Sequence, residues 1–333
     1  MSRITVLMPA YNVGPWIREA IESVLRQNFT DFTLLVIDDC STDDTAEVVR
    51  SFSDPRIRYE KNLHNLGLAE NLNRGLELSD TEFCARMDGD DIAEPTWLET
   101  GVKVLDSRPE VGICSFGFQF FGTKNSVVRF PELNEDSKAQ MFFGCTVIVP
   151  VFRRSVMVDN GLRYRTEAFP AEDYDMWSRC YRLTQVYNVQ QTMFHYRMHP
   201  TQISTSKAEA QRQKSNLVKL HMLEWLNPDF SEDEKRFFLD RFCKIESLAD
   251  LKKSKAFAKL LVSRNTLGHF STPALEKRFR YTIGINTLYF AEDKFFAKGH
   301  NPARFLKLLF SGFYFTIPAK NRFKILAKSL LFH

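Results

Sequence analysis

The chain has 333 residues, of which 44% are hydrophobic and 26% are charged, so it can bury a large core in about two domains. Its six cysteines are scattered and form no C-x-x-C pair, which argues against a disulfide framework or a zinc site and predicts small buried side chains. The N-terminal apolar run is too short for a signal peptide, and no run of about 18 apolar residues occurs. We therefore expect a cytoplasmic protein.

The formal charge of +4 hides a strong asymmetry along the chain. Residues 1–204 carry 21 Lys+Arg against 29 Asp+Glu, whereas residues 205–333 carry 24 against 12. The two parts therefore face different electrostatic partners. The change predicts a domain boundary near Ser204, with domains at 1–204 and 205–333.

Strand and helix patterns alternate through the first hundred residues. Apolar and β-branched runs predict four strands, in "ITVLMPAYN", "FTLLVIDDCS", "RIRYEKN" and "TEFCARMDGDD". Helical spacing predicts helices at 14–28, in "DDTAEVVRSF", and at 66–79. Strands separated by such helices favour an α/β fold, with a mostly parallel sheet covered by helices on both faces.

Polar residues follow three of these predicted strands: Tyr11–Asn12, Asp38–Asp39, and the group Asp88, Asp90 and Asp91. Ligands bind at the carboxyl ends of strands in such sheets, so these residues are expected to converge. The sequence contains neither G-x-G-x-x-G after the first strand nor a P-loop, so another group must neutralise any phosphate.

The stretch "ARMDGDD" places three carboxylates within four residues. Such a cluster belongs either on a solvated loop or around a hard cation. Asp88 and Asp90 flank Gly89, which allows close backbone approach. Mg²⁺ or Mn²⁺ bound by one or two carboxylates and completed by diphosphate oxygens is the usual arrangement for nucleotide substrates. At the end of a parallel strand we favour the cation.

Seven motifs occur together in a fixed order and cover most of residues 3–205. They are "VLMPAYN", "VIDDCSTDDT", "HNLGLAENLNRGL", "ARMDGDDIAEPTWLE", "FRRSV", "AEDYDMWSR" and "YRMHPTQIS". In this order the chain resembles the inverting family 2 glycosyltransferases, which have the GT-A fold. The resemblance implies a bacterial enzyme of surface-polysaccharide synthesis that moves a sugar from a nucleotide donor, expected to be a UDP-sugar.

The resemblance also assigns roles to residues of the strand ends. It implies a nucleotide-binding set made of Pro9, Ala10, Tyr11, Asp39, Asn65 and Asp88. Asp39 would bind the nucleobase, and Asp88 the ribose or the metal shell. Asp90 would bind the metal, Mn²⁺ or Mg²⁺, directly. Arg86 would pair with these acids or with phosphate.

A second acidic pair, Glu172 and Asp173, lies in "AEDYDMWSR". Inverting transfer needs a carboxylate to accept the proton of the acceptor hydroxyl, and Asp173 matches the family's base. Helical spacing follows it, so Asp173 is predicted at a helix N-terminus, where a carboxylate tends to stay ionised. Glu172 and Trp177 are candidates for the donor or acceptor pocket, although an aromatic residue at this spacing also suits the core.

In "YRMHPTQIS", Arg197 and His199 stand two residues apart in an extended segment, so both side chains can point the same way. The resemblance places this segment over the donor diphosphate, with His199 as a metal or phosphate contact and Arg197 beside it. The chain departs from the family before "FRRSV", where "CTVIVPV" lacks the usual histidine.

Residues 205–333 are predicted to be helical and basic, and no acidic residue follows Asp293. Lys320, Lys324 and Lys328 share one helical stripe, with Phe323, Leu326 and Leu330 roughly opposite. A basic amphipathic segment suits an anionic membrane surface and a lipid-linked acceptor. An ordinary helical subdomain or an oligomer interface is the alternative. Nucleic acid is not expected, because no recognised module is present.

The function predicted from the sequence is metal-dependent inverting glycosyl transfer to a glycan or lipid-linked hydroxyl. The chain would act in the cytoplasm, with peripheral attachment to the membrane. Two alternatives remain open. A sugar nucleotidyltransferase would share the sheet, but its glycine- and basic-rich phosphate loop is not found near the first strand. A catalytically inactive sugar-binding or scaffold subunit would have no need of Asp173.

Overall fold

The computed structural model of the chain describes residues 2–296 and 302–331. The chain divides into two compact units, residues 1–218 and 219–333. The division falls inside helix α9 (Ala208–Leu226) and so lies later than the predicted boundary near Ser204. The first part of α9 belongs to the first unit, where Gln211 Nε2 donates to the carbonyl oxygen of Pro170 at 3.0 Å. The net charge of the sequence therefore changes sign near Ser204, whereas the boundary between the two packed units lies after Val218.

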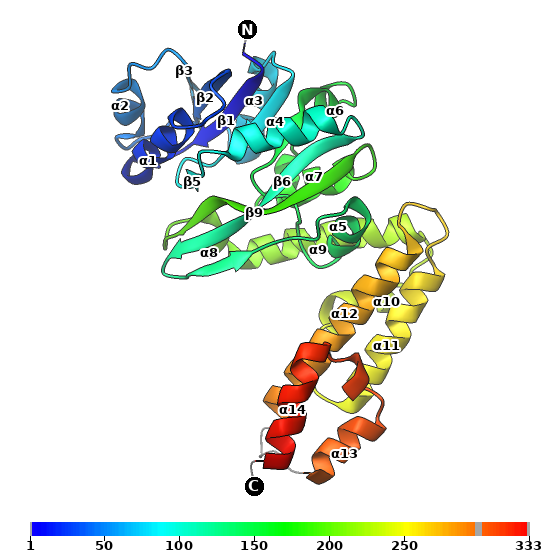
Figure 1. The fold of residues 1–333 in the computed structure, drawn as a ribbon. Helices are drawn as coiled ribbons and strands as arrows, with labels where there is room; N and C mark the ends of the chain where they lie inside the picture. Colours follow the sequence, from blue (N-terminus) through cyan, green and yellow to red (C-terminus); the bar gives the residue numbers. More distant parts are fainter. Residues whose placement is uncertain (1, 297–301, 332–333) are drawn as a thin grey trace. The chain divides into compact units, whose positions relative to one another are not determined.

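The first unit is built on a nine-stranded mixed sheet (Figure 1). Its first half is the predicted parallel part, in which β1 (Ile4–Ala10) lies between β2 (Phe32–Asp38) and β4 (Phe83–Arg86), with β3 (Ile57–Lys61) at the edge. These four predicted strands are confirmed. β8 (Val151–Arg153) then pairs antiparallel with β4 and joins the second half of the sheet.

The second half of the sheet comes from the segment after the predicted strands. Its strands are β5 (Ile92–Ala93), β6 (Val111–Gly122), β7 (Ser126–Val128) and β9 (Gln185–Met198). β6 pairs with β8, β7 and β9, and β5 pairs with β9 beside the "DGDD" turn. This pairing brings the end of β9 to the end of β4.

Helices cover both faces of this sheet, as the alternating pattern predicts. Ile4, Val6 and Met8 of β1 share one buried core with α1 (Gly14–Leu25) and α4 (Trp97–Ser107). Leu7 points to the opposite face, because successive side chains of a strand alternate. There it approaches α3 (Leu68–Leu78) closely at Gly75, where an added Cβ would lie 2.6 Å from Ile37 Cδ1 and 3.2 Å from Leu7 Cδ2.

The remaining helices of the first unit are short and join these layers. They are α2 (Thr45–Arg50), α5 (Asn134–Gln140), α6 (Arg154–Val158), the 3-10 turn η1 (Thr166–Ala168), α7 (Glu172–Cys180) and α8 (Ile203–Ser206). Helix α7 confirms the helix predicted after Glu172. Its N-terminal turn carries the second acidic pair.

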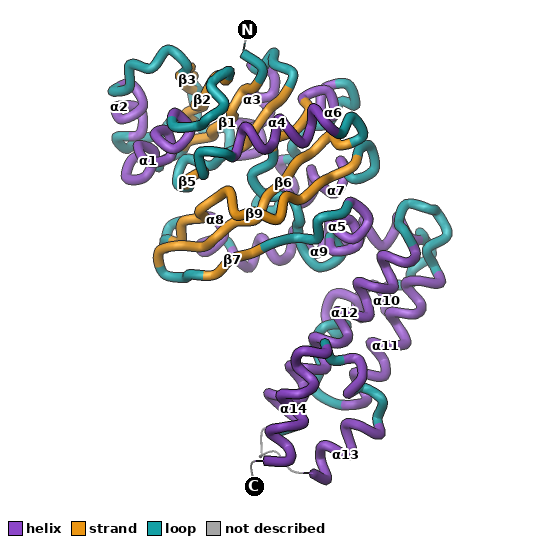
Figure 2. Tube along the Cα trace, viewed as in Figure 1, coloured by secondary structure: helices purple, strands orange, loops and turns teal. Residues whose placement is uncertain are grey.

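The described part of the second unit consists of helices joined by loops (Figure 2), as its sequence predicts. After α9 come α10 (Glu232–Asp240), α11 (Leu248–Ser263), α12 (Thr272–Phe290), the π-helical turn η2 (Ala291–Phe295), α13 (Pro302–Phe310), the 3-10 turn η3 (Tyr314–Thr316) and α14 (Ala319–Leu331). Local sequence fixes several helix starts. Ser231 and Glu234 form a reciprocal capping box at α10, and Ser247 and Ser271 cap α11 and α12.

One detail of the predicted amphipathic pattern is wrong. In α14 the side chain of Ile325 is fully buried, whereas Phe323 is 74% exposed. The apolar side of this helix is therefore rotated away from Phe323, which lies near Lys320 and Lys324 in the sequence and is exposed like them. The side chains of Lys328 and Leu330 lie outside the described part.

Candidate active site

The carboxylate of Asp39 anchors the loop that precedes α3. It accepts hydrogen bonds from the backbone N–H groups of Leu66 and Gly67, both at 2.8 Å, and from Asn62 Nδ2 at 2.6 Å. Gly67 has a φ of +83°, which suits glycine, at the start of α3. Asp39 is 2% exposed, so its carboxylate is buried but fully satisfied. Its backbone N–H, bonded to the carbonyl oxygen of Ala10 at 2.8 Å, ties the ends of β1 and β2 together.

The other predicted nucleotide-binding residues gather around this point. Pro9 and Ala10 are buried in β1, while the ring of Tyr11 directly after them is 49% exposed and available to stack on a base. Asn65 Nδ2 donates to the carbonyl oxygen of Asp39 at 3.2 Å. The structure thus brings Tyr11, Asp39 and Asn65 to one edge of the sheet.

Arg86 joins the two acidic clusters. It is the last residue of β4 and is only 7% exposed. Its guanidinium group bonds Asp88 Oδ1 at 3.0 Å and forms a close ion pair with Asp173 Oδ2. Burial opposes the charge, but Asp173 and Asp88 outweigh it and raise the pKa of Arg86 further above its ordinary value. Arg86 is therefore a permanent cation between the clusters.

The pair at the start of α7 is not fully satisfied. Oδ1 of Asp173 and Oε2 of Glu172 are buried and have no hydrogen-bond partner among the described residues. Burial raises the pKa of Asp173, with Arg86 acting against it. Burial and the neighbouring Asp173 raise the pKa of Glu172 to about 7. Burial therefore opposes the effect expected of the helix N-terminus on the pKa of Asp173, while the charge of Arg86 favours the ionised carboxylate.

Asp90 lies against His199, which follows β9. Its Oδ2 is 3.1 Å from His199 Nε2, and His199 Nδ1 is 3.0 Å from Thr201 Oγ1. The imidazole ring stacks on Trp16 of α1 with centroids 4.0 Å apart. Burial and the charge of Asp88 raise the pKa of Asp90, while His199 lowers it. A cation would relieve this crowding of carboxylates.

The donor set at this point fits a divalent cation that is completed by substrate. The carboxylate of Asp90 is an ordinary ligand of both Mg²⁺ and Mn²⁺, whereas the imidazole Nε2 of His199 suits a transition metal such as Mn²⁺ better than Mg²⁺. Across residues 2–296 and 302–331, no cluster of three or more His, Cys, Asp or Glu side chains could hold a metal by itself. Two protein ligands with the rest from phosphate and water is a usual Mg²⁺ arrangement.

Arg197 holds the backbone of the "DGDD" turn. Its Nε donates to the carbonyl oxygen of Asp90 at 2.8 Å, and its backbone N–H donates to Asp91 Oδ1 at 2.8 Å. Its Nη2 pairs with Glu19 at 2.6 Å. Both Arg197 and His199 therefore reach Asp90, as their spacing predicts, and Arg197 acts on its backbone.

Trp177 belongs to the core beneath the site. It is 1% exposed and packs edge-to-face on Phe152 and Tyr164, with ring centroids 5.7 and 6.2 Å apart. The prediction that it lines the sugar or acceptor pocket is therefore corrected. Its size and spacing are those of a core residue that supports α7.

Sequence reasoning missed three residues of the site. Trp16 and Asn62 contact predicted site residues, but helical spacing assigns Trp16 to the core and Asn62 lies in a predicted strand end. Val149, in the stretch that departs from the family, has a φ of +45°, which is strained for a β-branched residue. Its carbonyl oxygen accepts from Trp97 Nε1 at 3.1 Å, and the next carbonyl oxygen, of Pro150, accepts from Arg86 N at 3.1 Å.

All six cysteines are free, as predicted, but only Cys84, Cys114 and Cys180 are buried. Cys145 is half-buried near Asp173 and Arg86, and burial raises the pKa of its thiol to about 12. The thiol is therefore neutral at physiological pH.

The sheet order, the helical layers and the acidic strand ends define the GT-A class of glycosyltransferase. Residues 5–166 match the family described as Glycosyl transferase family 2. This region belongs to that family, and the protein is a glycosyltransferase.

Relatives and solved structures agree with this assignment. An uncharacterized glycosyltransferase of Haemophilus influenzae is 29% identical over 231 residues, which is 65% of this chain and 72% of the relative. The structure of S. aureus TarS 1–349 in complex with UDP-GlcNAc covers 88% of each chain with a TM-score of 0.59 and 18% identity. The mannosyltransferase PcManGT from Pyrobaculum calidifontis, in complex with GDP-Man and Mn²⁺, covers 88% of each chain with a TM-score of 0.52 and 17% identity. At these identities the two structures bear on the fold alone.

Proposed function

We propose that the protein transfers a sugar from a UDP-sugar to a hydroxyl group in one inverting displacement, with Asp173 as the general base. One observation carries this proposal: Oδ1 of Asp173 is a buried carboxylate oxygen without a hydrogen-bond partner among the described residues, next to Arg86 and at the carboxyl end of the sheet. Such an atom is costly unless a ligand satisfies it. A hydroxyl proton is the ligand that a general base requires.

Asp173 and Arg86 have different roles in the proposed reaction. The acceptor oxygen attacks the anomeric carbon, its proton passes to Asp173 Oδ1, and the bond to the diphosphate breaks on the opposite face. Arg86 fixes Oδ2 of the same carboxylate, so that Oδ1 is the oxygen left for the proton. Burial raises the pKa of Asp173 above its ordinary value, which makes the carboxylate a stronger base.

The donor would lie between the β1, β2 and β4 ends. Tyr11 would stack on the nucleobase, and Asp39 and Asn65 would shape the base pocket. A divalent cation held between Asp90 and His199 would offset the negative charge of the departing diphosphate. Uridine is the base to test first, because TarS was solved with UDP-GlcNAc, and guanosine is the alternative, because PcManGT was solved with GDP-Man.

Calorimetric titration with UDP tests the donor side of this proposal. UDP is expected to bind with Mn²⁺ and to lose affinity in EDTA. Asp90→Ala should weaken binding tenfold or more, about 1.4 kcal/mol, and the exposed control Asp80→Ala should leave it unchanged. If neither EDTA nor Asp90→Ala lowered the affinity for UDP, the metal assignment would be contradicted. If GDP bound more tightly than UDP, the base of the donor would be guanosine rather than uridine.

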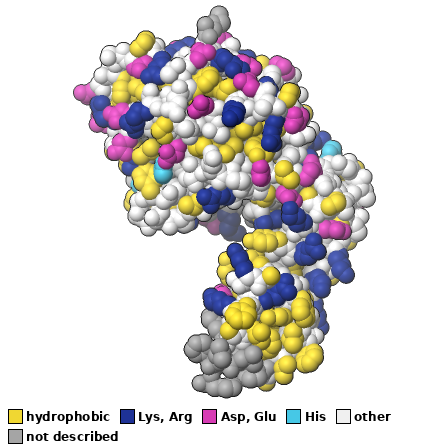
Figure 3. All heavy atoms as spheres, viewed as in Figure 1, with side chains coloured by type: hydrophobic (Ala, Val, Ile, Leu, Met, Phe, Trp, Pro, Cys, Tyr) yellow, Lys and Arg dark blue, Asp and Glu magenta, His cyan; other side chains and the backbone are white. Residues whose placement is uncertain are grey.

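We further propose that the second unit rests on an anionic membrane surface and that the acceptor is lipid-linked. Large apolar side chains are exposed there, with Phe310 at 82%, Phe323 at 74% and Phe315 at 61%. Figure 3 shows hydrophobic side chains on this unit beside Lys and Arg. Exposed aromatic residues among cations suit the interfacial region of a bilayer. Among the described residues, no helix combines the length and the apolar character needed to span a bilayer.

Vesicle co-sedimentation tests this surface. The wild-type protein is expected to bind vesicles that contain phosphatidylglycerol better than neutral ones, and the binding should weaken with salt. The double variant Phe310→Ser, Phe323→Ser should bind less, while Leu133→Ser, at an exposed leucine of the first unit, should bind normally. Equal binding by all three proteins would favour the oligomer interface instead.

A further inference from the structure

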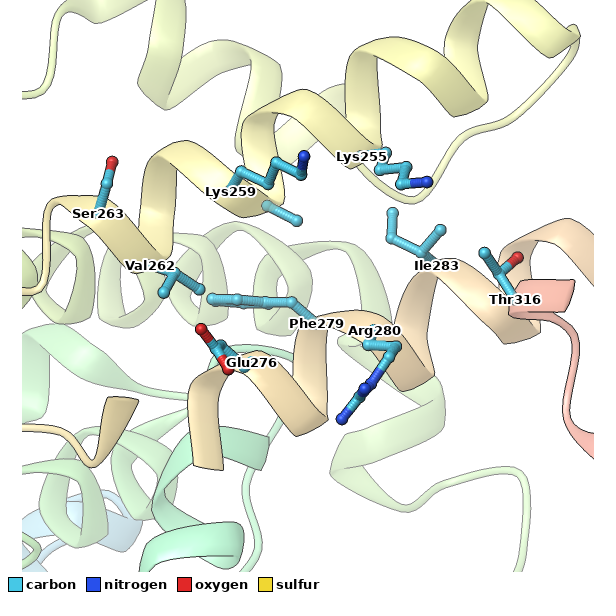
Figure 4. Close-up of a pocket in the computed structure, with 10 residues that line it drawn as sticks. Lys255, Lys259, Val262, Ser263, Glu276, Phe279, Arg280, Ile283 and Thr316 are labelled. Carbon is cyan, nitrogen blue, oxygen red and sulfur yellow. The ribbon is translucent and has the colours of Figure 1, made fainter. Parts of the chain in front are cut away.

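A cavity of about 510 Å³ lies within the second unit, between α11 and α12 (Figure 4). Its volume falls in the range of about 300–1,000 Å³ that is usual for small-molecule sites. Its apolar floor consists of Ala258 and Val262 from α11 and Phe279 and Ile283 from α12. Figure 4 shows Val262 and Phe279 meeting between the two helices. The site described above uses none of these residues.

A close backbone contact lies beside this cavity. Thr316 of η3 lines the cavity, and its carbonyl oxygen would lie 2.2 Å from a Cβ placed on Gly284 of α12. Only a glycine at 284 therefore lets η3 approach α12 so closely. The cavity is a consequence of how α11, α12 and η3 pack together.

The rim of the cavity is cationic. Lys255 and Lys259 of α11 and Arg280 of α12 line it and are exposed. Among the described residues, no salt bridge ties any of the three to an acidic side chain, although Lys255 Nζ lies 5.6 Å from the ring centroid of Phe313. Glu276 is the one carboxylate among the lining residues named for the cavity, and Ser263 and Thr316 add hydroxyl groups. The rim therefore has a surplus of two positive charges.

An apolar floor below a cationic rim complements one kind of ligand. An apolar chain would bury against Val262, Phe279 and Ile283, where burial of apolar area supplies the binding energy. A phosphate at the end of the chain would meet the cationic rim of Lys255, Lys259 and Arg280, where a lysine binds phosphate as a point charge and an arginine as a bidentate fork. A nucleotide lacks the apolar chain, and a neutral lipid lacks the anion.

We propose that this cavity binds a phosphate ester of a long apolar chain. The ligand comes either from a bilayer or from solution as a monomer. The proposal is independent of the donor site, because it rests only on residues of α11, α12 and η3.

Calorimetric titration of the full chain with dodecyl phosphate, below its micelle concentration, tests this proposal. Saturable binding is expected, with inorganic phosphate and the uncharged dodecyl maltoside each binding at least tenfold more weakly. The double variant Lys259→Glu, Arg280→Glu should lose at least tenfold in affinity. Lys252→Glu, the same charge change on α11 outside the cavity, should bind as the wild type does.

A second variant distinguishes loss of the ligand site from loss of the folded structure. Val262→Trp fills the apolar floor without changing the charge and should abolish dodecyl phosphate binding, while UDP binding at the first unit stays intact. Equal affinity for dodecyl phosphate in the wild type and both cavity variants would overturn the proposal, and so would equal affinity for dodecyl maltoside. If the same variants also lose binding to phosphatidylglycerol vesicles, the source of the ligand is a bilayer; if vesicle binding is unchanged, it is a monomer in solution.

Discussion

Two carboxylate sites of the first unit differ in how their buried oxygens are satisfied. Asp39 accepts two backbone N–H bonds and one side-chain N–H bond, so both of its oxygens have partners. At the start of α7, one oxygen of Asp173 and one of Glu172 have none among the described residues. Asp39 directly follows β2, and Glu172 and Asp173 are the first two residues of α7. Only the second of these two sites has carboxylate oxygens that can still accept a hydrogen bond from a ligand.

This difference separates acids that build the fold from acids that are available to a ligand. A buried carboxylate with a full set of donors stabilises the loop that supplies them. A buried carboxylate oxygen without a donor costs free energy, and a protein tolerates that cost where function uses the group. The comparison predicts that substitutions at Asp39 change mainly stability, whereas substitutions around Asp173 change mainly the reaction.

The largest effect is expected from Arg86→Met, which removes the cation between the clusters. Transfer should fall by about 10²-fold or more because Asp173 loses its orientation. The free energy of unfolding should fall by about 3 kcal/mol, since the carboxylates of Asp88 and Asp173 then repel each other without compensation. Denaturant unfolding and a transfer assay measure the two effects.

The matched control for that change is Arg58→Met. Arg58 also pairs with an acid two residues away, Glu60, at 3.0 Å, but both side chains are partly exposed. Its loss should cost less than about 1 kcal/mol and leave transfer intact. Similar losses in the two variants would show that burial of Arg86 is not what makes it important.

The next effect is expected from Asp39→Asn, which replaces an acceptor by a group with two N–H donors. The new amide NH₂ group then faces another donor, either a backbone N–H or the Nδ2 of Asn62, and no hydrogen bond forms between two donors. The free energy of unfolding should therefore fall by about 1–3 kcal/mol. The exposed Asp44, whose side chain does not cap α2, provides the control. Asp44→Asn should stay within about 0.5 kcal/mol of wild type by the same unfolding measurement. An Asp39→Asn protein as stable as that control would contradict the anchoring role.

A smaller effect concerns the pH dependence of stability at Glu172. Its pKa in the folded protein is raised to about 7, above the ordinary value of 4.5, by burial and by Asp173, with Asp88 adding to this and Arg86 opposing it. The folded protein therefore binds more protons than the unfolded chain between these pH values, and stability is lost as the pH rises through them. Glu172→Gln removes this dependence.

At pH 8, Glu172→Gln should thus exceed the wild type in unfolding free energy, on the order of 1 kcal/mol. Below pH 4.5 the advantage should disappear. Unfolding curves at pH 4, 6 and 8 measure it. A constant difference across this range would mean that Glu172 does not titrate with a raised pKa.

The local pattern of the chain predicts the parallel part of the sheet and the polar strand ends. Alternating apolar runs and helical periods depend on neighbours in the sequence, so β1 to β4 and α1 to α3 follow from the sequence alone. The ion pair between Arg86 and Asp173 does not, because it depends on how the later strands return to β4. The rotation of α14, with Phe323 outward, depends on packing against neighbouring helices. The stacking of Trp16 on His199 likewise needs β9 in place.

The most direct measurement compares Asp173→Asn with Asp175→Asn in the same helix. Asp175 is buried, and its carboxylate is paired with Arg179 at 2.7 Å and with Arg165 at 3.5 Å, whereas Asp173 has one buried oxygen without a partner among the described residues. With the UDP-sugar found by a hydrolysis screen, Asp173→Asn should lower the rate of UDP release by about 10²–10⁴-fold while UDP affinity stays unchanged. Asp175→Asn should be less stable but keep its rate. A normal rate in Asp173→Asn would contradict the assignment of Asp173 as the base.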